Sequence, residues 1–141
     1  MNAREYADKL GPVLATVAGE VARRLEQFHS AAEEAGDSVD RILIEVFVDQ
    51  DGEGPFDVWA RFDGVAAFAL DRRFDEERHL FGVERGEEGW EPDVPGRPLS
   101  WTRDDLELAV VEAVTEWLSP LIPPESPEGL WQIGTPDGVS A

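Results

Sequence analysis

Asp49, Asp51 and Glu53 are carboxylates at alternate positions, a spacing that could hold a metal ion. Calcium-binding loops use this spacing because alternate side chains converge on one cation, and they place a glycine at the sixth position, as Gly54 does here. At the twelfth position, where such loops carry a bidentate acid, this sequence has Ala60. The pattern therefore favours a hairpin turn, with calcium binding as the alternative, and no other cofactor is expected.

His79 could join these carboxylates in a small hydrolase or metal-dependent enzyme, which is the catalytic alternative. The other histidine, His29, is expected in solvent near the end of a helix, and the two show no metal-binding spacing. The chain has no nucleophile elbow, phosphate-binding loop or dinucleotide fingerprint. The sequence therefore favours binding over catalysis, and no catalytic residue is assigned.

Two amphipathic helices are predicted, one near each end of the chain, from apolar residues that recur every three or four positions. A kink is expected in the first helix at Gly11-Pro12. Between the helices, alternating or β-branched segments and Gly-rich turns predict four strands joined in sequence. We therefore predict an α+β fold with a long N-terminal helix, a four-stranded antiparallel meander, and a C-terminal helix packed on one sheet face. The predicted helices span 3–35 and 103–119, and the predicted strands span 41–49, 56–62, 65–70 and 78–85.

The two faces of the predicted sheet differ in character. The face that the helices cover should carry Ile42, Ile44, Val46, Val48, Phe56, Val58, Ala60 and Phe62. The opposite face should show Leu43, Glu45, Phe47, Asp57, Trp59 and Arg61, a mixture of aromatic and charged side chains that is typical of a protein interface. The alternative is that residues 121–133 fold across this second face and bury it.

Trp59 and Arg61 stand out because tryptophan and arginine are the residue types that dominate binding hot spots. The carboxylates around them would supply charge to the same surface. We therefore predict a partner-binding surface that consists of Glu45, Asp49, Asp51, Glu53, Asp57, Trp59 and Arg61.

The composition of this 141-residue chain indicates one globular domain of residues 1–134, followed by a flexible tail at 135–141. It has no cysteine and no apolar run long enough to span a membrane, so a cytoplasmic protein is expected. The net charge of −19 disfavours nucleic acid and anionic membranes, whose phosphates it would repel, and favours a basic partner. No oligomeric state is indicated.

Two blocks of the chain carry a family resemblance. The segment from Glu45 to Gly64, followed by His79 to Glu84, resembles a family of small uncharacterised bacterial proteins, mainly from actinobacteria. The resemblance implies a single cytoplasmic domain and assigns no activity and no catalytic residue.

An acidic protein-binding module is the function that the sequence favours, for example an immunity-type inhibitor of a basic partner such as a nuclease toxin. Opposite charges would speed the association and steer its orientation. One alternative is the metal-dependent enzyme or cation-binding protein described above. Another is a DNA-mimic protein, which would need rows of carboxylates that imitate phosphate spacing.

Overall fold

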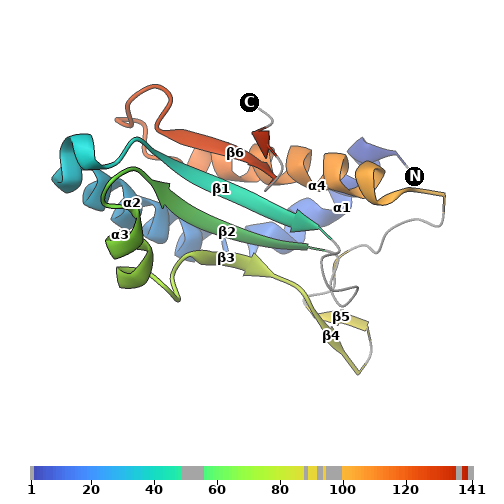
Figure 1. Ribbon diagram of the computed structural model, residues 1–141. Coiled ribbons are helices and arrows are strands. Elements are labelled where there is room, and N and C mark those ends of the chain that lie inside the picture. The colour runs from blue at the N-terminus through green and yellow to red at the C-terminus, as the bar shows by residue number, and fades with distance from the viewer. Residues whose placement is uncertain are drawn as a thin grey trace.

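The computed structural model describes residues 2–48, 56–87, 89–91, 94, 100–135 and 138–139. Four α-helices and seven strands lie in this part of the chain, with two short 3-10 helices, η1 and η2 (Figure 1). The helices are α1 (Ala3–Ala15), α2 (Ala18–Ala35), η1 (Gly36–Ser38), α3 (Ala67–Arg73), α4 (Arg103–Leu118) and η2 (Ser119–Leu121). The strands are β1 (Arg41–Val48), β2 (Phe56–Asp63), β3 (His79–Gly82), β4 (Glu84–Gly86), β5 (Gly89–Glu91), β6 (Trp131–Thr135) and β7 (Gly138–Val139).

The main sheet is mixed, with five strands in the order β3-β2-β1-β6-β7. β1 pairs antiparallel with β2 and parallel with β6, and β4 and β5 form a separate hairpin. The α+β class is therefore confirmed, but the purely antiparallel meander is wrong. The parallel pair arises because residues 131–135, for which no strand is predicted, add a strand beside β1 (Figure 1). Residues 138–139 of the expected tail pair with β6.

The third predicted strand, 65–70, is also wrong, because most of it forms α3. Alanine and leucine fill much of this segment, and both are strong helix formers. After Gly64, which has a φ of 126°, the chain turns into α3, where the Asp71 carboxylate accepts a hydrogen bond from the Phe62 N–H at 2.9 Å. This bond holds α3 against the end of β2. The fourth predicted strand is present as β3, paired antiparallel with β2.

The predicted single helix over 3–35 is two helices, α1 and α2, which meet at Thr16 and Val17. Pro12 lies inside α1, so the expected kink at Gly11-Pro12 is not where the helix ends. The Thr16 and Val17 N–H groups instead donate to carbonyls three residues back, Val13 at 3.2 Å and Leu14 at 3.1 Å. Such tight bonds close the last turn and let the chain change direction.

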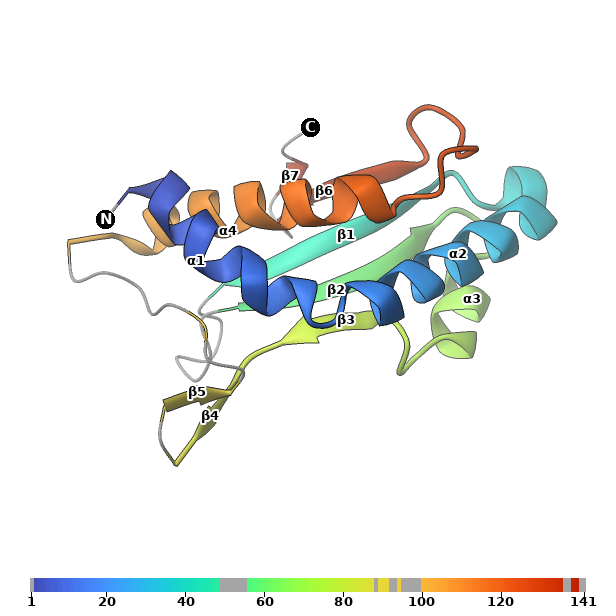
Figure 2. The same ribbon diagram turned by 180° about the vertical axis from the view of Figure 1, so that it is seen from behind.

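The core lies between the sheet and the helices α1, α2 and α4, which cover the same face (Figure 2). Phe28 of α2 meets Phe62 of β2 edge to face, with ring centroids 5.8 Å apart. The inward residues predicted from the strand alternation are confirmed, since none is more than 1% exposed. They are Ile42, Ile44, Val46, Val48, Phe56, Val58, Ala60 and Phe62.

His29, expected in solvent, is 5% exposed and belongs to the buried side of α2. Its ring is buried, with Nε2 3.1 Å from the Glu33 carboxylate. Within the described ranges, no helix is both long and apolar enough to cross a membrane.

A candidate binding surface on the open sheet face

The sheet face turned away from α1, α2 and α4 is the candidate functional site, and we call it the open face (Figure 1). Successive side chains of a strand point to opposite faces, so the residues between the buried ones of β1 and β2 point here. Most of them are partly exposed, whereas Leu43 is 8% exposed. The open face consists of Arg41, Leu43, Glu45, Phe47, Asp57, Trp59, Arg61, Asp63 and His79.

Trp59 lies near the middle of the open face. It is the register partner of Glu45 on β1 and of His79 on β3. Its indole stacks on the His79 imidazole with ring centroids 4.4 Å apart and an angle of 13° between the planes. The Arg78 guanidinium carbon lies 5.8 Å from the ring centroid, within the range of a cation–π interaction. The indole is only partly buried, so an aromatic surface stays accessible at the centre of the face.

Asp57 and His79 form a polar pair beside this tryptophan. His79 Nε2 lies 3.1 Å from Asp57 Oδ1, and about 40% of each side chain is exposed (39% and 41%). The pair lies directly over Gly82, the register partner of Asp57. A Cβ atom at position 82 would come within 2.5 Å of the imidazole and 2.7 Å of the carboxylate oxygen. The glycine therefore makes room for the Asp57–His79 pair.

Two ion pairs connect β1 and β2 across the open face. Arg61 Nε donates to Glu45 Oε1 at 2.9 Å, and Arg41 Nε donates to Asp63 Oδ2 at 2.8 Å. The hydrogen bond to Glu45 raises the pKa of Arg61 above its ordinary value, because it favours the charged guanidinium. The Glu45 side chain is 16% exposed, whereas Arg61 is 43% exposed. The Arg61 guanidinium is therefore the more accessible group of this pair.

The structure brings together four of the seven residues predicted for partner binding: Glu45, Asp57, Trp59 and Arg61. The other three, Asp49, Asp51 and Glu53, lie outside the described residues, and so does the calcium loop that they would form. In the part of the chain that the structure does describe, no group of three or more His, Cys, Asp or Glu side chains could hold a metal ion.

The alternative in which residues 121–133 fold across the second face is wrong. Residues 131–133 lie within β6, beside β1 in the plane of the sheet. The Trp131 indole N–H donates to Ser126 Oγ at 2.9 Å, and the side chain packs against the core. The strand therefore widens the open face instead of covering it.

His79 and Gly82 are members of this site that sequence reasoning did not place there. The sequence suggests His79 as a companion of the loop carboxylates, whereas in the structure it pairs with Asp57 and stacks on Trp59. The available signal was the alternation of Asp57 and Trp59 on one strand with a histidine on the next. The pairing register decides which residues meet, and a bulge between Val58 and Trp59 shifts that register.

Comparison with known proteins gives a family and nothing closer. No curated protein and no solved structure matches this chain. The match to a family covers residues 1–141 and so includes every residue of the open face. The chain therefore belongs to DUF6389, a family of unknown function.

Proposed function

We propose that this protein is a binding module that docks a basic protein on its open face. The observation that carries the proposal is the partly exposed Trp59, which contacts His79 and Arg78 near the centre of a sheet face that α1, α2 and α4 leave free. A large aromatic side chain with charged neighbours is the usual anchor of a protein interface.

The contacts on the open face would hold such an anchor in place before binding. Stacking on His79 fixes one side of the indole, and the His79–Asp57 pair fixes the imidazole. The Arg61–Glu45 and Arg41–Asp63 pairs join β2, the strand that carries the indole, to β1. A preformed anchor loses less conformational entropy on binding, which favours affinity.

The charge of the whole molecule supports a basic partner. The chain carries 31 acidic and 12 basic residues, whereas the open face itself has its carboxylates paired with arginine or histidine. The long-range field would therefore attract and orient a cationic protein, while the paired face supplies the close contacts. An immunity-type inhibitor of a basic enzyme is one form that such a module takes.

The experiment compares two alanine variants of the full chain. Trp59→Ala removes the proposed anchor, and Leu108→Ala removes a side chain that is 69% exposed on α4, on the other side of the molecule. Partners are captured from a lysate of the encoding organism and identified by mass spectrometry. The most enriched basic protein is then purified, and its affinity for each variant is measured by calorimetry.

We expect Trp59→Ala to weaken binding of this partner by about 30-fold or more, which is the effect of a hot-spot residue. Leu108→Ala should leave the affinity unchanged. The affinity of the parent protein should also fall as salt is added, because salt screens the attraction between opposite charges. Equal affinity of the parent and Trp59→Ala would remove the open face as the docking surface.

A further inference from the structure

Two strongly exposed apolar side chains lie together where the chain enters α3. Val65 is 92% exposed and Phe68 is 75% exposed. α3 packs on the core through Ala67, Leu70 and Phe74, so Phe68 lies on the outer side of the helix. Single exposed apolar residues are ordinary at a protein surface, whereas adjoining ones mark a contact site.

Unpaired positive charge follows this apolar surface along the helix. Arg72 and Arg73 end α3, are exposed, and form no ion pair with the described residues. The acids nearest to them in the sequence, Asp71 and Asp75, lie within 4 Å of Arg78 instead. Every other arginine whose side chain the structure describes is within ion-pair distance of a carboxylate. In a chain with 31 acidic residues, this end of α3 therefore keeps charge that the molecule itself does not use.

Aromatic rings, rather than carboxylates, hold these two arginines. The Arg72 guanidinium carbon lies 5.7 Å from the centroid of the Phe68 ring, and that of Arg73 lies 5.0 Å from the centroid of the Phe74 ring. Both distances are within the range of a cation–π interaction. The positive charge is therefore continuous with the apolar surface.

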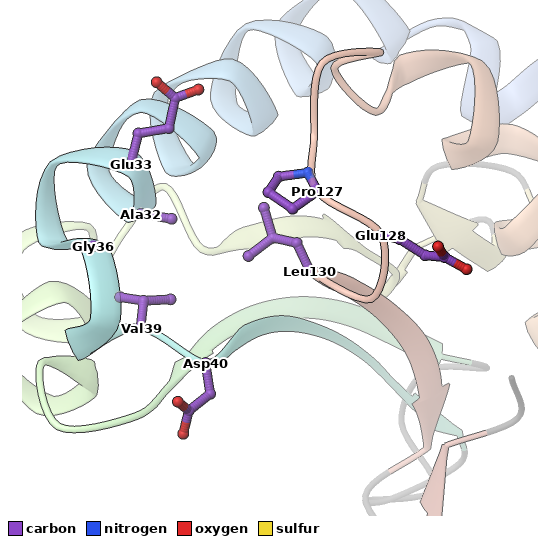
Figure 3. Close-up of a pocket in the computed structure, with 8 residues that line it drawn as sticks. All are labelled: Ala32, Glu33, Gly36, Val39, Asp40, Pro127, Glu128 and Leu130. Carbon is purple, nitrogen blue, oxygen red and sulfur yellow. The ribbon is translucent and has the colours of Figure 1, made fainter.

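Unpaired negative charge lies at the other end of α3. Asp37 and Asp40 are exposed and form no ion pair within the described ranges. Ser38, which lies between them in the sequence, accepts a hydrogen bond at its carbonyl from the Ala66 N–H at 2.9 Å, so this acidic segment is tied to the start of the helix. Figure 3 shows the Asp40 carboxylate pointing away from the pocket of about 270 Å³ beside Leu130.

Acids, apolar side chains and bases thus follow one another from η1 along α3. Both η1 and α3 lie at the same end of the molecule (Figures 1 and 2). Such a surface is complementary to itself, because a two-fold axis places a second copy against it in the opposite direction. Phe68 would then meet Phe68 of the second copy. Arg72 and Arg73 of each copy would face Asp37 and Asp40 of the other.

We propose that this surface is the contact of a homodimer, in which two α3 helices pack antiparallel about a two-fold axis. The apolar centre is removed from water, and both sets of unpaired charges gain partners. A different acidic protein would use the arginines but would be repelled by Asp37 and Asp40, so the charge pattern favours a second copy of this chain. Because α3 is short, the contact is small and the dimer is weak. The dimer does not depend on the binding of a basic protein at the open face.

The test is sedimentation of the full chain over a range of concentrations. Phe68→Ser removes the apolar centre, and the matched control Leu108→Ser removes a side chain that is 69% exposed on α4. Arg72→Glu makes the charges of the surface acidic, whereas the double variant Asp37→Arg, Asp40→Arg makes them basic. All of these residues are exposed, so the variants keep the fold, which circular dichroism verifies.

We expect the parent protein to dimerise with a Kd of about 10–100 µM, and Phe68→Ser to raise this Kd by about tenfold or more. Leu108→Ser should leave the Kd unchanged. The acidic and the basic variant should each dimerise more weakly than the parent, whereas an equimolar mixture of the two should form a heterodimer, because opposite charges then meet at both ends of the contact.

Three results would overturn the proposal. One is a parent protein that stays monomeric at about 1 mM, well above the expected Kd. Another is an equal loss of dimer in Phe68→Ser and Leu108→Ser. The third is a mixture of the acidic and basic variants that is no more dimeric than either variant alone.

Discussion

At the scale of single residues, Gly82 is the position on which the arrangement around Trp59 depends. An alanine there would place its Cβ 2.5 Å from the His79 ring and 2.7 Å from Asp57 Oδ1, closer than van der Waals contact allows. The imidazole would have to move, and its stacking on Trp59 and its bond to Asp57 would be lost. We expect Gly82→Ala to destabilise the protein by about 1 kcal/mol, measured by urea unfolding, because the obstructing atoms are the ends of partly exposed side chains that can move.

A double-mutant cycle separates this clash from a general effect of the substitution. In a His79→Ala background most of the obstruction at position 82 is absent, so Gly82→Ala should cost much less than it does in the parent. Equal costs in the two backgrounds would show that the imidazole is not what requires glycine.

The residues of the open face show which parts of a site a sequence can predict. Alternation along β1 and β2 placed Glu45, Asp57, Trp59 and Arg61 on one face, because a strand has a fixed side-chain period of two. It could not pair His79 with Asp57, because that contact depends on how β3 aligns with β2. Nor could it indicate the pocket beside Leu130, which forms between segments about 90 positions apart in the chain.

At the scale of elements, the contact between α1 and the start of α4 contains the only tyrosine of the chain. Tyr6 is 0% exposed and its ring lies 5.5 Å from that of Trp101. Burial raises the pKa of Tyr6, because the phenolate would lose its hydration. The unfolded chain ionises this phenol near pH 10 while the folded chain keeps its proton. The contribution of this group to stability is therefore fully present below about pH 10. Above that pH, the group lowers the free energy of unfolding by up to about 1.4 kcal/mol per pH unit.

Tyrosinate absorbance measures this directly, since no other tyrosine contributes. We expect the absorbance to rise only as the protein unfolds at alkaline pH. Tyr6→Phe should show a shallower loss of stability above pH 10, whatever its stability at neutral pH. Formation of tyrosinate near pH 10 in a protein that is still folded would contradict the prediction.

The elements themselves show why the sheet was only partly predictable. Its core strands, β1 and β2, are predicted by alternating or β-branched residues and by the Gly-rich sequence between them. Asp63-Gly64 is typical of a hairpin turn and so predicts a strand after it. The alanines and leucine of that segment instead follow their helix preference, and Asp71 of the resulting helix accepts the Phe62 N–H. β6 is too short to give a clear strand signal in the sequence. Its parallel pairing depends on the edge of β1, which is distant in the chain.

At the scale of the whole molecule, self-repulsion among carboxylates should limit stability. If each of the 12 basic residues neutralised one acid, 19 of the 31 carboxylates would still be unbalanced. Exposed ion pairs such as Arg4–Asp8 contribute little to stability because water screens them, so they cannot offset a field of this size. Added salt weakens both the attraction within ion pairs and the repulsion among the excess carboxylates. We expect the weaker repulsion to have the larger effect on stability.

We therefore expect the unfolding midpoint to rise as sodium chloride increases from about 0.01 M to about 0.15 M, where the Debye length falls from about 30 Å to about 8 Å. Glu125→Lys, at an exposed residue without an ion pair in the described part of the chain, should raise the midpoint at low salt and lose that advantage at high salt. Calorimetric scans of both proteins across the salt series measure the two effects. An unfolding midpoint that falls with salt would contradict this prediction. It would mean that the paired surface charges stabilise the fold more than the excess carboxylates destabilise it. The negative field proposed to steer a partner would then cost the protein little stability.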